Sequence, residues 1–197
     1  DGKPVKVSVP PTLLISSIGV HPDAAKAVSL EAKIAGDLVY VVGPTREELG
    51  GSEYFAHLGS PGNTAPALDA AAAKERYTRL ASAIAHELVA SAFPVSHGGL
   101  GVALAKVAIA GRLGMDLTLP VPDSIRPDYF VFSESLSRFV VTVAPDHKRA
   151  FEQALGKDAV LLGRTGGRSL RISGRTLLLD VGIDELEKAY KAPFGGY

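Results

Sequence analysis

Residues 93–106 read FPVSHGGLGVALAK, and the order of residue types there restricts the local fold more than any other stretch. A short apolar approach is followed by a polar turn with two adjacent glycines and then by an alanine-rich run. This order predicts a strand, a tight turn and the first turns of a helix. Gly98 and Gly99 allow a ligand to approach the backbone closely, and the N–H groups at a helix start attract phosphate or carboxylate. A purely structural turn is the alternative interpretation.

The composition is that of a globular chain. With 197 residues, of which 46% are hydrophobic and 21% charged, the chain is able to bury a sizeable core. Its 21 Lys and Arg residues balance its 21 Asp and Glu residues, which argues against nucleic acid or a membrane surface as the main partner. In addition, no apolar run approaches the roughly 20 residues that span a bilayer.

Two residue types limit the chemistry further. The chain has no cysteine, which excludes disulfides, thiolate catalysis and cysteine-ligated zinc, and which fits a cytoplasmic location. Its five histidines lack the HExxH-like spacing of a metal site. Except for His97, they are interpreted as solvated or hydrogen-bonded side chains, at positions 21, 57, 86 and 147.

Apolar and β-branched runs predict short strands, and longer periodic runs predict helices. The predicted strands cover residues 12–20 (as a buried strand), 27–33, 38–43, 117–121, 138–143, 160–162, 169–172 and 176–179. The predicted helices cover residues 52–55, 67–92, 99–111, 146–155 and 184–191, with hairpins expected at 163–167 and 173–174. Because these elements lack a regular βαβ rhythm, we expect an α+β fold with a mixed or antiparallel sheet and helices packed on one face.

A second glycine pair stands in the motif GGSEY. Gly50 and Gly51 precede Ser52, so that backbone N–H donors and a hydroxyl group are available together. This combination suits a phosphate or a carboxylate. The alternative is a simple turn in which Ser52 caps the short helix that follows.

The third polar cluster, SESLSR, covers residues 133–138 and lies where a strand is predicted to begin. The carboxylate of Glu134 is suited to hold Mg²⁺ through oxygen or to orient a substrate hydroxyl. The alternative is a surface pair with Arg138, worth under about 1 kcal/mol. His97, in the first glycine turn, either binds phosphate or caps the helix.

The three clusters occur in an order and spacing that resemble phosphoribosylformylglycinamidine synthase of the subunit II type, in the aminoimidazole ribonucleotide synthetase-like superfamily. The segments that carry the resemblance are 38–55, 95–111 and 132–143. Residues 9–20 look like the end of that family's preceding domain, and residues 177–193 look like its C-terminal tail. The resemblance therefore implies a C-terminal domain fragment. In it, residues 1–20 end the preceding domain or form a connecting strand, and residues 21–197 form the synthetase-like domain.

The resemblance also implies a reaction. The family amidates formylglycinamide ribonucleotide in purine biosynthesis, using ATP and Mg²⁺ and ammonia that a separate glutaminase releases from glutamine. The family's catalytic histidines and main ATP- and magnesium-binding acids lie upstream of the segments present here. The expected partners are therefore the N-terminal half of the same synthase, the glutaminase subunit and a small accessory subunit, and the chain alone is expected to be inactive.

Substrate and phosphate binding carry over residue by residue, whereas no catalytic residue does. The implied substrate-binding residues are Gly50, Gly51, Ser52, Tyr54, Ser96, His97, Gly98, Gly99 and Arg138, and Glu134 is the implied metal ligand. The chain departs from the family at the first turn, where many members have two acidic residues and this chain has Pro94 and His97. The departure puts a magnesium–nucleotide site at this turn in doubt but leaves a phosphate contact through backbone N–H groups.

Two alternative functions stay open. The chain resembles, less closely, the thiamine-phosphate and selenophosphate members of the same superfamily, against which GGSEY argues. A non-catalytic scaffold domain that holds subunits together is the other alternative, and the missing acidic pair supports it.

Overall fold

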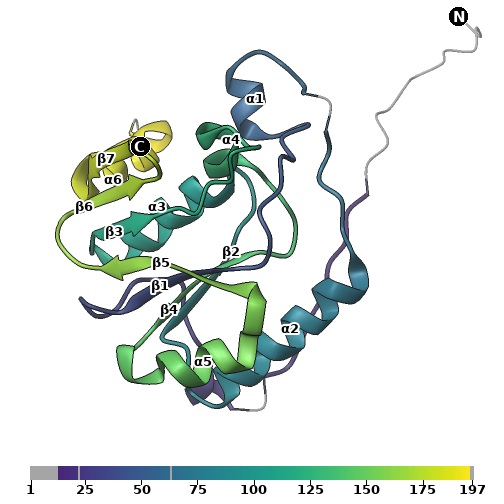
Figure 1. Ribbon diagram of the computed structural model, residues 1–197, viewed down its shortest axis with the longest axis vertical. Helices are drawn as coiled ribbons and strands as arrows, with labels where there is room; N and C mark the ends of the chain where they lie inside the picture. Colours follow the sequence, from purple (N-terminus) through teal and green to yellow (C-terminus); the bar gives the residue numbers. More distant parts are fainter. Residues whose placement is uncertain (1–12, 22, 63, 196–197) are drawn as a thin grey trace, which may run out of the picture.

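The computed structural model describes residues 13–21, 23–62 and 64–195, and in this part of the chain seven strands form one sheet (Figure 1). The strands are β1 (Leu38–Val42), β2 (Ser91–Pro94), β3 (Met115–Thr118), β4 (Phe139–Val143), β5 (Ala159–Thr165), β6 (Ser169–Ser173) and β7 (Leu177–Gly182). Their order is β2-β4-β1-β5-β3-β6-β7. All neighbours are antiparallel except β3 and β6, which are parallel.

Helices connect and cover the strands. They are α1 (Glu53–His57), α2 (Ala70–Ala85), α3 (Gly99–Gly111), α4 (Pro127–Phe132), α5 (Lys148–Leu155) and α6 (Ile183–Lys191). Short 3-10 turns lie at Ala24–Lys26, Pro145–His147, Gly156–Asp158 and Ala192–Phe194. Within the described ranges, no helix has the length and apolar character that crossing a membrane requires.

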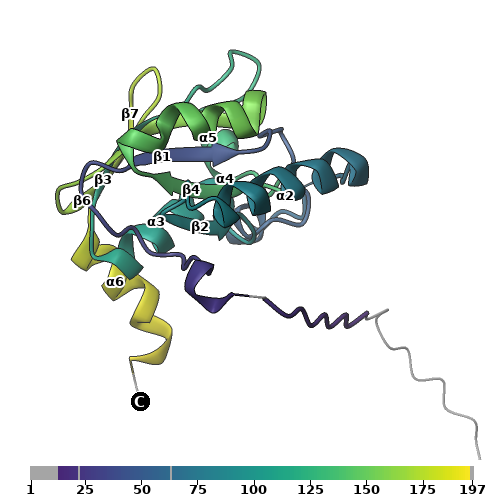
Figure 2. The same cartoon turned by 90° about the horizontal axis from the view of Figure 1, so that it is seen from below.

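The mixed sheet and the α+β class agree with the prediction, but the helices lie on both faces of the sheet rather than on one. In β1, Val39 and Val41 belong to a core with α3 and α4, whereas Leu38, Tyr40 and Val42 belong to a second core with α2 and α5. Figure 2 shows α5 on one side of β1, and α3 and α6 on the other. The sequence of β1 explains why both faces of the sheet are covered, because five consecutive apolar residues leave this strand no polar face toward water.

Two predicted strands near the start of the chain are not strands in the structure. Residues 13–20 are irregular, and their large apolar side chains are 77–98% exposed; Thr12 lies outside the described residues. Residues 27–33 are also irregular, although the Ala92 N–H donates to the Ser29 carbonyl along the edge of β2. The apolar pattern of these segments predicts burial in a sheet, but no strand in the described part of the chain supplies the partner.

The helix predicted at 67–92 is shorter in the structure. Asp69 caps α2, since its carboxylate accepts a hydrogen bond from the Ala72 N–H at 3.0 Å. The helix ends at Ala85, and Glu87 then adopts a positive φ of 58° before β2 begins. The prediction runs past the end of α2 because Leu88 continues the four-residue spacing of Leu80 and Ile84.

The hairpin predicted at 163–167 is wrong. β3 lies between β5 and β6, so these two strands do not pair. The chain instead crosses over β3, where the Gly114 N–H donates to the Gly167 carbonyl at 3.0 Å. The hairpin at 173–174 is confirmed by the pairing of β6 with β7.

Candidate functional site

The three polar clusters meet at one carboxylate. Glu134 Oε1 accepts hydrogen bonds from the Gly98 N–H at 2.8 Å and from the Glu53 N–H at 2.9 Å. The Glu134 N–H in turn donates to the Glu48 carbonyl at 3.0 Å. Residues 50–54, residues 96–99 and Glu134, separate in the sequence, therefore form one surface, which we call the glycine face.

Within GGSEY, the chain itself satisfies the donors that were predicted for a ligand. The Gly50 and Gly51 N–H groups donate to the carbonyls of Thr64 and Pro61, both at 2.7 Å. Ser52 is buried, and its hydroxyl accepts from the Phe55 N–H at 3.2 Å as an N-cap. The geometry is that of the alternative interpretation, a tight turn followed by a capped helix.

Tyr54 fastens α1 to α4. Its ring stacks on Phe132, with centroids 4.8 Å apart and an interplanar angle of 5°, and its hydroxyl donates to Asp128 at 2.7 Å. That hydrogen bond, the largest cause, raises the pKa of Tyr54. Burial opposes the ionisation of Asp128, but the hydrogen bonds from Tyr54 and Arg126 hold the pKa of its carboxyl below the ordinary value. Tyr54 therefore positions the helix that carries the motif.

The turn at residues 96–99 has the strand–turn–helix geometry that its sequence predicts. Gly98 and Gly99 have φ angles of 80° and 67°, and a Cβ atom on Gly99 would lie 2.4 Å from the Ser133 carbonyl oxygen. The Gly99 N–H donates to the Ser96 carbonyl at 2.9 Å. The backbone donors of this turn are thus held by the chain, Gly98 by Glu134 and Gly99 by Ser96.

His97 lies on the outside of this turn. It is 81% exposed, and its Nδ1 lies 3.8 Å from a Glu53 carboxylate oxygen and 3.9 Å from Glu134 Oε2. Ser96 beside it is also exposed. Gly51 and Glu53 are the other exposed residues of the glycine face.

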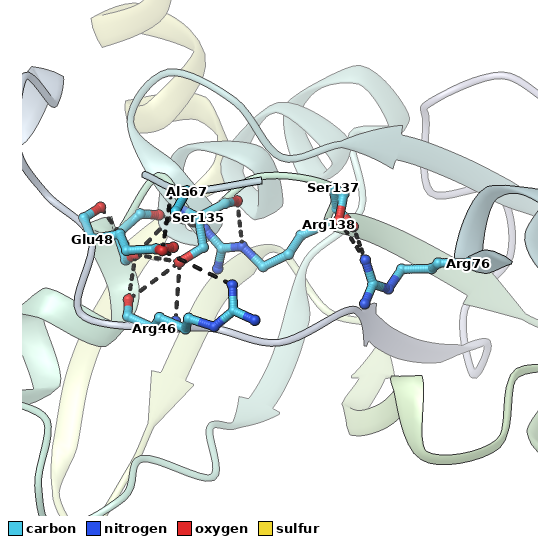
Figure 3. Close-up of polar contacts among 8 residues, drawn as sticks. Arg46, Glu48, Ala67, Arg76, Ser135, Ser137 and Arg138 are labelled. Carbon is cyan, nitrogen blue, oxygen red and sulfur yellow. Dashed lines mark hydrogen bonds and ion pairs between the residues drawn. The ribbon is translucent and has the colours of Figure 1, made fainter. Parts of the chain in front are cut away.

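Arg138 lies inside the protein, so the predicted surface pair with Glu134 is wrong. Its side chain is 1% exposed and donates to the Ser135 carbonyl at 2.9 Å, the Thr45 hydroxyl at 2.9 Å and the Ser133 carbonyl at 2.5 Å. Burial lowers the pKa of Arg138 to about 10, against the opposing effect of Glu48 and Glu134. Figure 3 shows the side chain beside the loop 133–138, so Arg138 positions this loop, and its contact with a substrate stays a prediction.

Residues that sequence reasoning missed hold the other side of this loop. Ser133 donates to the Arg46 carbonyl at 2.6 Å, and the Arg46 N–H donates to the Ser135 hydroxyl at 3.0 Å (Figure 3). Glu48 is buried, and its Oε1 accepts from the Ala67 N–H at 3.2 Å. The sequence predicts only a turn at residues 44–49, and the charged pair Arg46–Glu48 is the one signal of this role.

The residues of the glycine face do not form a metal site by themselves. In the described ranges, no group of three or more His, Asp or Glu side chains has an arrangement that could hold a metal ion. Glu134, the implied magnesium ligand, already accepts two backbone hydrogen bonds through one oxygen. The phosphate contact predicted at the turn and the metal role predicted for Glu134 stay predictions.

Comparison with known proteins agrees with this architecture. Residues 35–174 match the family described as AIR synthase related protein, C-terminal domain. The chain is 38% identical over 187 residues to the phosphoribosylformylglycinamidine synthase subunit PurL of Moorella thermoacetica, and 33% identical over 192 residues to that of Alkaliphilus metalliredigens. These matches cover 92% and 94% of this chain but 25% and 26% of the relatives. The chain thus spans about a quarter of the length of the curated relatives that it matches.

Solved structures show the same fold. Thermotoga maritima PurL complexed with FGAR matches with a TM-score of 0.74 and 19% identity, over 83% of this chain and 30% of that one. The same protein complexed with ATP matches with a TM-score of 0.66 and 20% identity, over 83% and 27%. A chain of a HypE–HypF complex matches with a TM-score of 0.56 and 20% identity, over 75% of this chain and 52% of that one. Because the family match spans most of the chain and the sheet has the same fold, this chain belongs to the family of AIR synthase related C-terminal domains.

Proposed function

We propose that this chain is the C-terminal part of a phosphoribosylformylglycinamidine synthase, which uses ATP to amidate formylglycinamide ribonucleotide in purine biosynthesis. The observation that carries the proposal is the 38% identity to a PurL subunit over 92% of the chain. The PurL structures complexed with FGAR and with ATP support these two ligands for the complete enzyme. In that enzyme ATP, with Mg²⁺, would activate the amide oxygen for displacement by ammonia.

The role of this chain within the reaction is binding and positioning. Orientation and charge neutralisation account for most of the catalysis of phosphoryl transfer, and helix starts with glycine turns serve both. The glycine face offers the exposed Ser96 and the exposed His97 to an anion, whereas its Gly98 N–H is bonded to Glu134. Since Glu134 holds the Gly98 N–H, a phosphate that binds there must displace this carboxylate. We therefore assign Glu134 the role of holding the turn in shape until the ribonucleotide arrives.

The exposed apolar residues of the segment 13–20 support packing against another domain or subunit. Residues 13–20 carry five large apolar side chains that are 77–98% exposed, far more than a water-facing segment normally gathers in eight residues. We propose that this segment packs against the N-terminal half of the synthase, as the end of the preceding domain or as a connecting strand. A Thermotoga maritima structure of PurLQS supports assembly with the glutaminase and the small accessory subunit.

One observation favours the scaffold alternative. The donors of both glycine motifs, at Gly50, Gly51, Gly98 and Gly99, already have partners inside the chain. A domain that only holds subunits together needs no free donor. The two roles differ in whether ligand affinity depends on the glycine face.

The test uses the full-length polypeptide that contains this chain, together with its glutaminase and accessory subunits. We expect ATP-dependent amidine formation from formylglycinamide ribonucleotide, and no phosphoryl transfer to thiamine phosphate or selenide. In the His97→Ala variant we expect a raised KM for the ribonucleotide with little change in kcat. Exposed Lys188, on α6, supplies the control Lys188→Ala. An unchanged KM in His97→Ala would favour the scaffold role, and activity toward thiamine phosphate or selenide would overturn the proposal.

A further inference from the structure

A second polar site lies at the same end of the sheet as the glycine face. Val42, the last residue of β1, pairs with Phe139 at the start of β4 and with Ala159 at the start of β5. Phe139 also pairs with Pro94, which leads into the glycine turn. On the side of the sheet that carries α2 and α5, this end opens into a cavity of about 380 Å³ between residues 43–46, α2 and the turn before β5. Volumes of this size hold small molecules.

The cavity has more cations than carboxylates. Its charged lining residues are Arg46, Arg76, Arg79 and Lys157, set against Glu75 and Asp158. We call this site the arginine cavity. A concave surface with an excess of one charge concentrates the opposite charge from solution.

Two of the arginines share one carboxylate. Asp158 accepts from Arg79 at 2.7 Å and lies 3.5 Å from Arg76, and both the Arg76 and the Asp158 side chains are nearly buried. The Nε atoms of Arg76 and Arg79 are buried and have no hydrogen-bond partner in the described part of the chain. Glu75 lies 3.6 Å from Arg79 but is 70% exposed, so water screens its charge. Arg76 also donates to the Ser137 carbonyl and hydroxyl, and Arg79 donates to the Leu155 carbonyl at 3.1 Å, but these partners are uncharged. One carboxylate thus balances the charge of two guanidinium groups.

The other two cations stand at the mouth of the cavity. Arg46 and Lys157 are exposed and are carried by the two loops that flank the opening. The Arg46 guanidinium lies 3.9 Å from a carboxylate oxygen of Glu48. Figure 3 shows Arg46 and Arg76 approaching the loop 133–138 from its two ends. All four cations line the same cavity, two of them exposed and two of them less accessible to water.

We propose that the arginine cavity binds the phosphate group of a small molecule, separately from the glycine face. Arginine is suited to this ligand because its planar fork of N–H donors matches the oxygens of a phosphate. A dianion balances the excess of two positive charges among the six charged lining residues. The volume of the cavity limits the ligand to a free phosphate or to a small phosphate ester.

The experiment records amide spectra of the ¹⁵N-labelled chain during titration with inorganic phosphate and, in a second arm, with ribose 5-phosphate. Chloride keeps the ionic strength constant. We expect saturable shifts at Gly43, Lys157 and Asp158 and at the Nε–H signal of Arg79. Equal affinity for the two ligands identifies a free phosphate as the ligand, and tighter binding of the ester identifies a sugar phosphate.

A matched pair of double variants decides whether the cavity charges cause the binding. Arg46→Gln with Lys157→Gln removes two exposed cations at the mouth, and we expect about tenfold weaker binding at the cavity signals. Arg171→Gln with Lys188→Gln removes the same charge from exposed positions on β6 and α6, and we expect unchanged binding. Shifts confined to Gly98 and Gly99, no saturable shift at the cavity, or equal weakening in both double variants would each overturn the proposal.

Discussion

The glycine face and the arginine cavity lie at one end of one sheet, yet the chain treats its polar groups there in opposite ways. On the glycine face, the carboxylate of Glu134 accepts hydrogen bonds from two backbone N–H donors. In the arginine cavity, four cations line a hollow that contains two carboxylates. The first site is occupied by the protein's own carboxylate, whereas the second has more positive than negative side chains. The difference suggests that ligand binding requires displacement at the first site and only addition at the second.

The largest expected effect tests the loop 133–138 that separates the two sites. Arg138→Met deletes three hydrogen bonds to the loop and to Thr45, leaving buried acceptors without donors. We expect a loss of about 4 kcal/mol in the free energy of unfolding, measured by urea denaturation. Arg171→Met, at an exposed position on β6, is the control and should lie within about 0.5 kcal/mol of the wild type. Equal stability of the two variants would mean that Arg138 does not hold the loop.

The next effect tests how tightly the glycine face is built. In Gly99→Ala, the new Cβ atom would lie 2.4 Å from the Ser133 carbonyl oxygen at a φ of 67°, and we expect a loss of about 3 kcal/mol. Gly167 has nearly the same φ, 69°, but a methyl group added there would meet nothing within 4 Å. Gly167→Ala should therefore lose only about 1 kcal/mol from backbone strain. If thermal denaturation shows the same loss in both variants, close packing at the turn is not the cause.

A smaller effect is expected when the arginine cavity loses its shared carboxylate. Asp158→Asn leaves Arg76 and Arg79 without their common counter-charge, which should cost about 2 kcal/mol, since Arg79 is partly exposed to water. Added inorganic phosphate should raise the melting temperature of this variant more than that of the wild type. Glu75→Gln removes an exposed carboxylate from the same cavity as a control. A phosphate response no larger than that of the wild type would contradict the difference drawn between the two sites.

The smallest change in stability is expected when the glycine face loses the negative charge of Glu134. Glu134→Gln keeps an oxygen acceptor for Gly98 and Glu53 but removes the charge, at a cost of about 1 kcal/mol. Because the remaining amide competes less well for these donors, phosphate should now shift the Gly98 amide signal at lower concentration. The measurement is a titration followed by amide spectra, with Glu53→Gln as the matched variant. An unchanged Gly98 response would show that Glu134 does not guard the turn.

Local signals in the sequence predict local structure well. The turn at 96–99 and the Ser52 cap depend on neighbouring residues alone, and both are present in the structure. The run of five apolar residues in β1 also signals burial on both faces, although the prediction placed the helices on one. The resemblance implied binding roles for residues of all three clusters, whereas the hydrogen bonds of Glu134 that join them were not predicted.

Contacts between distant residues are beyond a single sequence. The placement of β3 between β5 and β6 depends on pairings across more than 40 residues, so a glycine-rich stretch predicted as a hairpin is a crossover instead. Arg138 was interpreted either as a substrate-binding residue or as one half of a surface pair. In the structure it is buried, and hydrogen bonds to two carbonyl groups of its own loop and to the Thr45 hydroxyl offset the cost of its burial. The arginine cavity joins residues from α2 with residues near 46 and 158, which no spacing in the sequence connects.

The loop 133–138 has a consequence for communication between the sites. Its second residue, Glu134, holds the glycine turn, and its fifth, Ser137, accepts hydrogen bonds from Arg76 through its carbonyl and its hydroxyl. A ligand that displaces Glu134 on one side of the sheet therefore acts on the same short segment to which Arg76 is hydrogen-bonded on the other side. If both ligands move this segment, each must change the affinity of the other by the same factor, because coupling between two binding equilibria is reciprocal. The loop would then couple the two sites, so that a ligand bound on one side of the sheet changes the affinity for a ligand on the other side.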